Sequence, residues 1–135
     1  MLKATVVSTE KGRVVIMDSI TKVTPDDAGA NVVSASHGGA SSGEFALEVP
    51  LSSVFFNDAG VGKEGAGIAA LATLEARGIV AGTVSHESAK IGDSQDMWDH
   101  GVISHANKHA IERGLLPGLK LKDTLAASVA ARAGP

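Results

Sequence analysis

Three polar, glycine-rich segments contain most of the side chains that could perform chemistry in this sequence. They are 37–43 (HGGASSG), 57–65 (NDAGVGKEG) and 85–96 (SHESAKIGDSQD). Histidine titrates near neutral pH and can therefore give and take protons, and a carboxylate can orient it or act as a base. We therefore expect His86, Asp58 and His37 to form an acid–base site, with His86 as the principal acid or base.

The same segments contain groups suited to binding a small anion. Backbone amides of glycine-rich turns and helix N-termini attract negative charge, and Lys63 adds a cation. The expected ligand-binding residues are Gly38, Gly39, Ser41, Asn57, Gly60, Gly62, Lys63, Ser85, Ser88 and Asp93. Asp58 has three open roles: a base, an orienter of His86, or a turn cap. The predicted function is an enzyme acting on a small, anionic metabolite, by hydrolysis, elimination or isomerisation.

A non-catalytic role is the alternative, in which the domain binds a phosphate or another anion and the acid–base residues are incidental. The amides of 38–39 and 60–62 would then be the donors. Residues 60–65 (GVGKEG) also spell G-x-G-x-x-G, with Glu87 near the spacing of a ribose-binding acid. A full dinucleotide-binding domain does not fit beside the other elements, so we do not expect NAD or FAD. The alternative explanation of this motif is that its glycines let the helix predicted over 64–77 pack closely on the sheet.

Residues 39–43 (GASSG) spell G-x-S-x-G and follow His37-Gly38. This stretch resembles the nucleophile elbow of α/β-hydrolases, in which HGG-type loops supply oxyanion donors. The resemblance covers only seven residues, and the chain is far shorter than a hydrolase sheet requires. A capped helix start at Ser41 or Ser42 explains the same residues.

No cofactor is expected, with a divalent metal ion as the alternative. His37, Asp58, His86 and Asp93 offer nitrogen and oxygen donors for such an ion, without a local ligand spacing of known type. His105 and His109 have i, i+4 spacing on a predicted helix. Ala106 stands where H-E-x-x-H requires glutamate, which excludes that metalloprotease motif.

Hydrophobic periodicity places these residues on a series of short elements. A hairpin is predicted at 3–8 and 13–18, with strands at 31–36, 53–56 and 79–84. A short helix is predicted to begin at 24–27. Longer helices are predicted at 41–49, 64–77, 93–113 and 123–132.

Strands that alternate with helices predict a parallel sheet, and consecutive apolar residues in the strands indicate cover on both faces. We therefore predict a single α/β domain over 1–135: a small layered domain with a central, mainly parallel sheet, an N-terminal β-hairpin and helices on both faces. The three polar segments then meet at the carboxyl edge of the sheet, where open α/β folds bind their ligands.

The composition of the chain excludes some classes of binding partner. The chain has 135 residues, a net charge of −3 and no cysteine. No basic stripe is present, so we expect neither nucleic acid nor an anionic membrane surface as a partner. No signal-peptide core or long apolar run occurs, and a cytoplasmic protein is predicted. The apolar positions of 123–132 predict a homo-oligomer, most simply a dimer paired through that helix.

Overall fold

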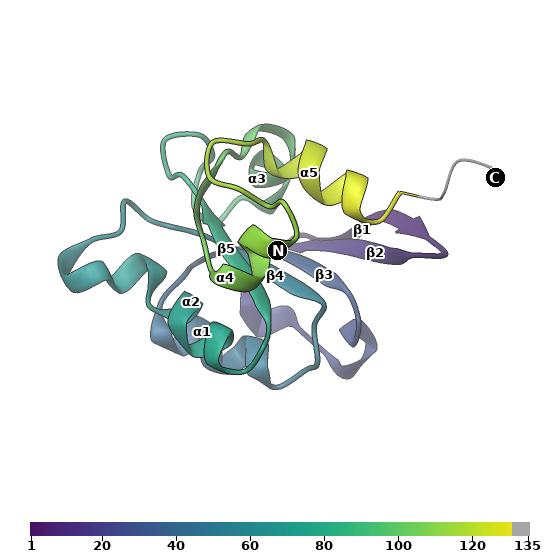
Figure 1. The fold of residues 1–135 in the computed structure, drawn as a ribbon, viewed down its shortest axis with the longest axis horizontal. Helices are drawn as coiled ribbons and strands as arrows, with labels where there is room; N and C mark the ends of the chain where they lie inside the picture. Colours follow the sequence, from purple (N-terminus) through teal and green to yellow (C-terminus); the bar gives the residue numbers. More distant parts are fainter. Residues whose placement is uncertain (131–135) are drawn as a thin grey trace.

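The computed structural model describes residues 1–130, and a six-stranded sheet runs through its centre (Figure 1). The strands are β1 (Lys3–Thr9), β2 (Gly12–Met17), β3 (Asn31–His37), β4 (Ser53–Asn57), β5 (Val80–Val84) and β6 (Ile103–Ala106). Their order across the sheet is the same as their order in the chain. The strands β2, β3, β4 and β5 pair in parallel, whereas β1 and β6 pair antiparallel at the two edges. The predicted α/β fold with its N-terminal hairpin is confirmed.

Helices cover both faces of the sheet (Figure 1). The α-helices are α1 (Ala40–Leu47), α2 (Ala70–Ala76), α3 (Ser94–His100), α4 (Lys108–Glu112) and α5 (Leu121–Ser128). Short 3₁₀ helices are η1 (Ile20–Lys22), η2 (Pro25–Asp27) and η3 (Lys63–Ile68). In the described part of the chain, no helix has the length and apolar character needed to cross a membrane.

Two cores form because successive strand residues point to opposite faces. Phe56 packs with α1, α2 and η1 through Ala46, Leu74 and Ile20. Its neighbour Phe55 packs on the other face, with side chains of α3 and α5. Both phenylalanines are fully buried, which is why the central strands have consecutive apolar residues.

The predicted helix over 93–113 is wrong. It is divided into α3, β6 and α4, because Gly101 ends α3 in an extended conformation and the chain then pairs with β5. A Cβ at residue 101 would lie 2.3 Å from the carbonyl oxygen of Met97, so glycine is required at this turn. His105 therefore lies on β6 and His109 on α4, and they do not share a helix face.

Two other helix predictions need correction at their starts. The helix predicted over 64–77 forms an α-helix only from Ala70, because Glu64 and Gly65 adopt left-handed conformations within η3. The helix predicted from Ser41 begins at Ala40 after Gly39, and no side chain caps it. Serine capping was the wrong explanation for the two hydroxyls.

The C-terminal helix packs on its own sheet. Leu121 and Leu125 are fully buried and Val129 is nearly so, all in the core that also holds side chains of α3. Of the apolar positions that predicted pairing between two chains, Leu125 and Val129 are therefore covered within one chain, whereas Ala126 is half-buried and Ala130 exposed. The homo-oligomer stays a prediction. Residues 131 and 132 of the predicted helix lie outside the described residues.

Candidate functional site

The ends of β3, β4 and β5 bring the three polar segments together, as predicted. His37 pairs with Asn57, and Asn57 pairs with Val84, so these strands end side by side. Adjacent strands lie about 4.8 Å apart, which places His37 about 10 Å across the edge from the segment that follows β5. Asp58 lies between them, directly after β4.

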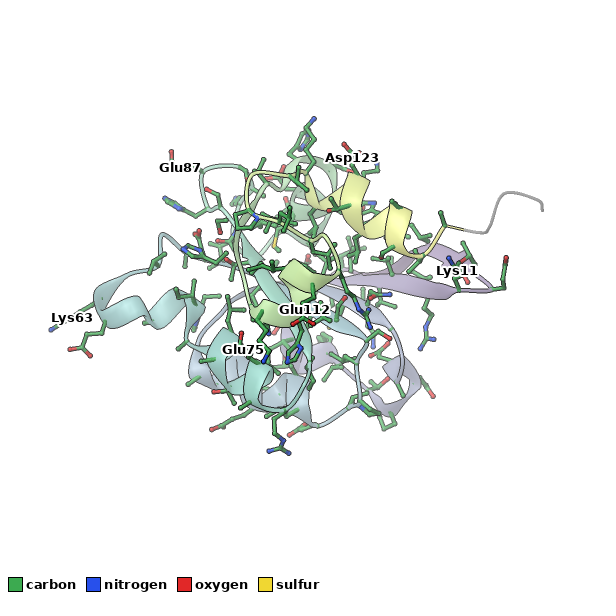
Figure 2. The ribbon with its side chains drawn as sticks, viewed as in Figure 1. Lys11, Lys63, Glu75, Glu87, Glu112 and Asp123 are labelled. Atoms are coloured by element: carbon green, nitrogen blue, oxygen red, sulfur yellow. The ribbon has the colours of Figure 1, made fainter. Side chains whose placement is uncertain are left out.

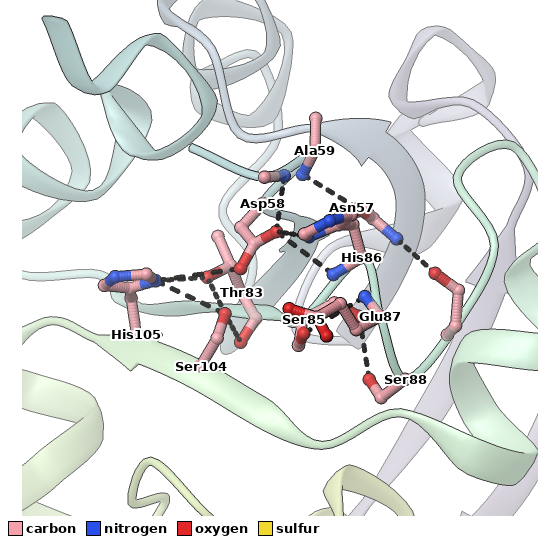
Figure 3. Close-up of polar contacts among 12 residues, drawn as sticks. Asn57, Asp58, Ala59, Thr83, Ser85, His86, Glu87, Ser88, Ser104 and His105 are labelled. Atoms are coloured by element: carbon pink, nitrogen blue, oxygen red, sulfur yellow. Dashed lines mark hydrogen bonds and ion pairs between the residues drawn. The ribbon is translucent and has the colours of Figure 1, made fainter. Parts of the chain in front are cut away.

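Asp58 is a buried carboxylate at the centre of this edge, with only 4% of its surface exposed (Figure 3). Its Oδ1 accepts hydrogen bonds from the amides of Gly60, at 2.8 Å, and His86, at 3.1 Å. Of the three roles that the sequence left open, these contacts are those of a turn cap, because they hold the turns that follow β4 and β5. The roles of Asp58 as a base or as an orienter of the His86 ring stay predictions.

Two imidazoles approach opposite oxygens of this carboxylate. Nδ1 of His86 lies 3.3 Å from Oδ1, and Nδ1 of His105 lies 4.0 Å from Oδ2. Both rings are partly exposed, with 48% of the His86 side chain and 39% of the His105 side chain open to solvent. The arrangement therefore joins one buried charge to two accessible proton carriers.

Burial raises the pKa of Asp58, but hydrogen bonds more than compensate. The Gly60 amide, the Ser104 hydroxyl and the His86 amide stabilise the charged form, as does the positive charge of protonated His86. The pKa of Asp58 is therefore held below its ordinary value, and the group is a carboxylate at neutral pH.

β6 contributes residues that the predicted set of site residues did not include. Ser104 lies 2.9 Å from the hydroxyl of Thr83, and Nδ1 of His105 lies 3.4 Å from the same hydroxyl. Thr83 is fully buried, so these contacts attach the new edge strand to the site. The two adjacent β-branched residues Val102 and Ile103 were the available signal for a strand here.

The loop after Asp58 is unusual in its backbone. Ala59, Val61 and Glu64 are the non-glycine residues with positive φ in the described chain, at 52°, 67° and 57°. Gly60, Gly62 and Gly65 have positive φ as well. Left-handed conformations are costly for β-branched residues such as Val61, so the loop stores strain next to the buried carboxylate.

The amides of this loop are already used within the protein. Ala59 donates to the side chain of Asn57, and Gly60 to that of Asp58. The amides of Val61 and Gly62 donate to backbone carbonyls of the same loop. The Gly38 amide donates to the backbone carbonyl of Asn57. The predicted anion receptor therefore lacks the donors assigned to it at 38 and 60–62.

Several other predicted ligand-binding residues hold the loops in place. Asn57 donates to the carbonyl of Ala89, and Ser88 accepts from the amide of Val102. Ser85 accepts from the amide of Glu87. Asp93 caps α3 through the amide of Asp96, so its carboxylate does not join Asp58. Lys63 lies at the outer end of η3 and points away from the sheet (Figure 2).

Two cavities lie beside His37. The larger, of about 340 Å³, is bordered by η1, the start of α1 and the Ile91–Gly92 turn, and includes Ser41. The smaller, of about 250 Å³, is bordered by His37 and the strained loop. Neither is lined by Asp58, His86 or His105, which occupy the open edge of the sheet.

The geometry does not support the other predicted chemistries. Over residues 1–130, no three His, Asp or Glu side chains are placed to hold a metal ion, so His37, Asp58, His86 and Asp93 do not form one set. Ser41 is the second residue of α1 rather than a strained elbow between strand and helix. Gly60–Gly65 leads into a 3₁₀ segment instead of opening an α-helix, unlike a dinucleotide-binding turn.

Comparison with models of protein families, with curated proteins and with solved structures finds no match for this chain. The assignment of function therefore rests on the geometry of the site.

Proposed function

We propose that this protein is an enzyme that moves protons on a small, anionic metabolite, with His86 as the acid or base and Asp58 as its orienting carboxylate. The observation that carries the proposal is the double contact of His86 with the buried Asp58, through its ring and through its amide. A buried carboxylate that fixes an accessible imidazole is a recurring arrangement for acid–base catalysis.

We assign a role to each ring nitrogen from this contact. Nδ1 is the nitrogen that lies 3.3 Å from Oδ1 of Asp58, so in the proposed neutral form Nδ1 carries the proton and Nε2 is left as the base. When Nε2 takes a proton from the substrate, the carboxylate stabilises the resulting imidazolium. His105, beside the other oxygen, is the second group able to exchange a proton.

A small, anionic substrate fits the open edge on which these rings lie. The two partly exposed imidazoles are the groups there that can meet a substrate, whereas the loop amides are occupied. Hydrolysis, elimination and isomerisation all use such proton transfers. The lack of cysteine favours a reducing compartment, so we place the enzyme in the cytoplasm.

The test is incubation of the protein with a mixture of small metabolites in D₂O, followed by mass spectrometry. We expect one metabolite to gain deuterium or to be converted to product. His86→Ala and Asp58→Asn should each slow that change by about 100-fold or more. His100→Ala is the matched control, because His100 also contacts an aspartate, Asp96, at 2.9 Å, but at an exposed position.

Wild-type rates in both His86→Ala and Asp58→Asn would remove this assignment. A metabolite that stays bound in native mass spectrometry and is returned unchanged would instead favour the second candidate function, binding without catalysis. The larger cavity supports that candidate, since its volume of about 340 Å³ is typical of small-ligand sites and it does not include Asp58 or His86.

A further inference from the structure

Ser104 is a bulged residue in the pairing of β5 with β6. Thr83 pairs with His105 and Val84 pairs with Ile103, so Ser104 has no partner residue of its own on β5. A bulge of this kind turns a side chain out of the alternation of a regular strand. The Ser104 hydroxyl therefore meets the ring of its own neighbour, at 3.3 Å from Nδ1 of His105.

Three oxygen atoms surround Nδ1 of His105 (Figure 3). They are Oγ of Ser104 at 3.3 Å, Oγ1 of Thr83 at 3.4 Å and Oδ2 of Asp58 at 4.0 Å. The carboxylate can only accept a hydrogen, and each hydroxyl has a single hydrogen to donate. Which nitrogen of neutral His105 has the proton therefore depends on where the two hydroxyl hydrogens point.

The hydrogen of the Ser104 hydroxyl has acceptors that cannot donate in return. One is the backbone carbonyl of Thr83, at 3.4 Å, and the other is the Asp58 carboxylate, whose charged form this hydroxyl stabilises. With that hydrogen so directed, Thr83 must be the donor in the 2.9 Å contact between the two hydroxyls. The only hydrogen of the buried Thr83 hydroxyl is then used, so its oxygen accepts from Nδ1–H of His105.

The opposite tautomer of His105 forms fewer hydrogen bonds in this network. With the proton on Nε2, Nδ1 is an acceptor, and one of the two hydroxyls has to give its hydrogen to the ring. The chain from the ring through Thr83 and Ser104 to a final acceptor then loses one hydrogen bond. The lone pair of Nδ1 also faces the negative charge of Asp58, which is unfavourable. Both effects favour the proton on Nδ1.

We propose that Ser104 is a positioning residue that holds the proton of neutral His105 on Nδ1 and leaves Nε2 as the nitrogen that takes a proton from the substrate. The inference rests on the proposed function only for the use of Nε2 in catalysis. The location of the proton is a property of the chain without substrate, and it can be measured there.

The test is nitrogen NMR of the isotope-labelled full chain without substrate, at an alkaline pH at which imidazole rings are neutral. The chemical shifts of the two ring nitrogens give the ratio of the two neutral tautomers. We expect wild-type His105 to have its proton mainly on Nδ1. Ser104→Ala releases the Thr83 hydroxyl to donate to Nδ1, so the ratio of Nδ1–H to Nε2–H should fall about fivefold, the effect of one net hydrogen bond.

Two further variants separate the hydroxyl from its surroundings. Ser104→Thr keeps the hydroxyl and should keep the wild-type ratio. Ser52→Ala is the matched control, because Ser52 is also half-buried and donates to a backbone carbonyl, that of Gly29 at 2.8 Å, outside this network. It should leave the ratio unchanged.

Ser104→Val is the second variant without a hydroxyl, in case Ser104→Ala does not fold, since β-branched residues suit strands. It should lower the ratio as Ser104→Ala does. A wild-type proton mainly on Nε2, or a wild-type ratio in both variants, would overturn the proposal. An equal fall in Ser104→Thr would overturn it as well, because the hydroxyl would then not be the cause. Failure to find a metabolite would remove the proposed function, but it would not change this measurement.

Discussion

The ring and the backbone amide of His86 meet the same oxygen of Asp58. The amide nitrogen lies 3.1 Å from Oδ1, and Nδ1 lies 3.3 Å from it. The carboxylate thus fixes both the turn after β5 and the imidazole that this turn presents. A change at Asp58 should therefore alter stability as well as catalysis.

Asp58→Asn should lower the free energy of unfolding by about 1–3 kcal/mol at neutral pH, because hydrogen bonds to a charged acceptor are lost. The pKa of Asp58 in the folded protein lies below its ordinary value of 3.8. The stabilisation by the charge is thus fully present above that value and disappears as the pH falls through the lower, folded pKa. Urea unfolding of both proteins from pH 7 to pH 3 measures the difference. A gap that stays constant over this range would contradict the prediction.

Val61→Gly should raise the free energy of unfolding by about 1 kcal/mol, because glycine adopts the positive φ at this position without strain. Urea unfolding at neutral pH measures the change. Val23→Gly is the matched control: Val23 is also half-buried but has an ordinary φ of −63°, and its replacement should destabilise the protein. If both variants lose stability equally, the strain assigned to Val61 is absent.

Gly67→Ala should destabilise the fold by about 3 kcal/mol or more, since overpacking against backbone cannot be relieved by a side-chain rotation. A Cβ at residue 67 would lie 1.9 Å from the carbonyl oxygen of Asp58. Gly62→Ala serves as the comparison, because its φ is 73° but nothing lies within 4 Å of the added carbon. It should cost only about 1–2 kcal/mol in thermal or urea unfolding. Equal losses would show that space at residue 67 is not the constraint.

Leu125→Ala should lower the free energy of unfolding by about 2–5 kcal/mol, as expected for a fully buried leucine. If the protein is a homo-oligomer, as the sequence predicts, this change should leave the mass in light scattering unaltered, because Leu125 packs within its own chain. Dissociation of a folded oligomer by Leu125→Ala would show that α5 also forms an interface.

The sequence was sufficient to place Asp58 and His86 together. The apolar runs at 53–56 and 79–84 predict buried parallel strands, and residues that follow such strands meet at one edge. Because parallel strands all end at the same edge, the polar residues that follow neighbouring strands lie near one another. His37, Asp58 and His86 were found in this way without knowledge of the strand order.

The rest of the site depends on contacts that local patterns do not encode. The apolar spacing around Gly101 fits a helix, but pairing with β5 favours a strand, and this placed His105 beside Asp58. The left-handed backbone at Ala59 and Val61 runs against the preference of both residues. The uncapped start of α1 depends on where the His37 ring lies, which is a tertiary contact.

The agreement between chain order and sheet order affects how the molecule can assemble during synthesis. Each strand pairs with the one made just before it, from β1 to β6, so the sheet can grow by addition at one edge as the chain emerges from the ribosome. Asp58 and His86 would come together once β5 is added, whereas His105 arrives with β6. The addition of the edge strand β6 is therefore the step that completes the candidate site.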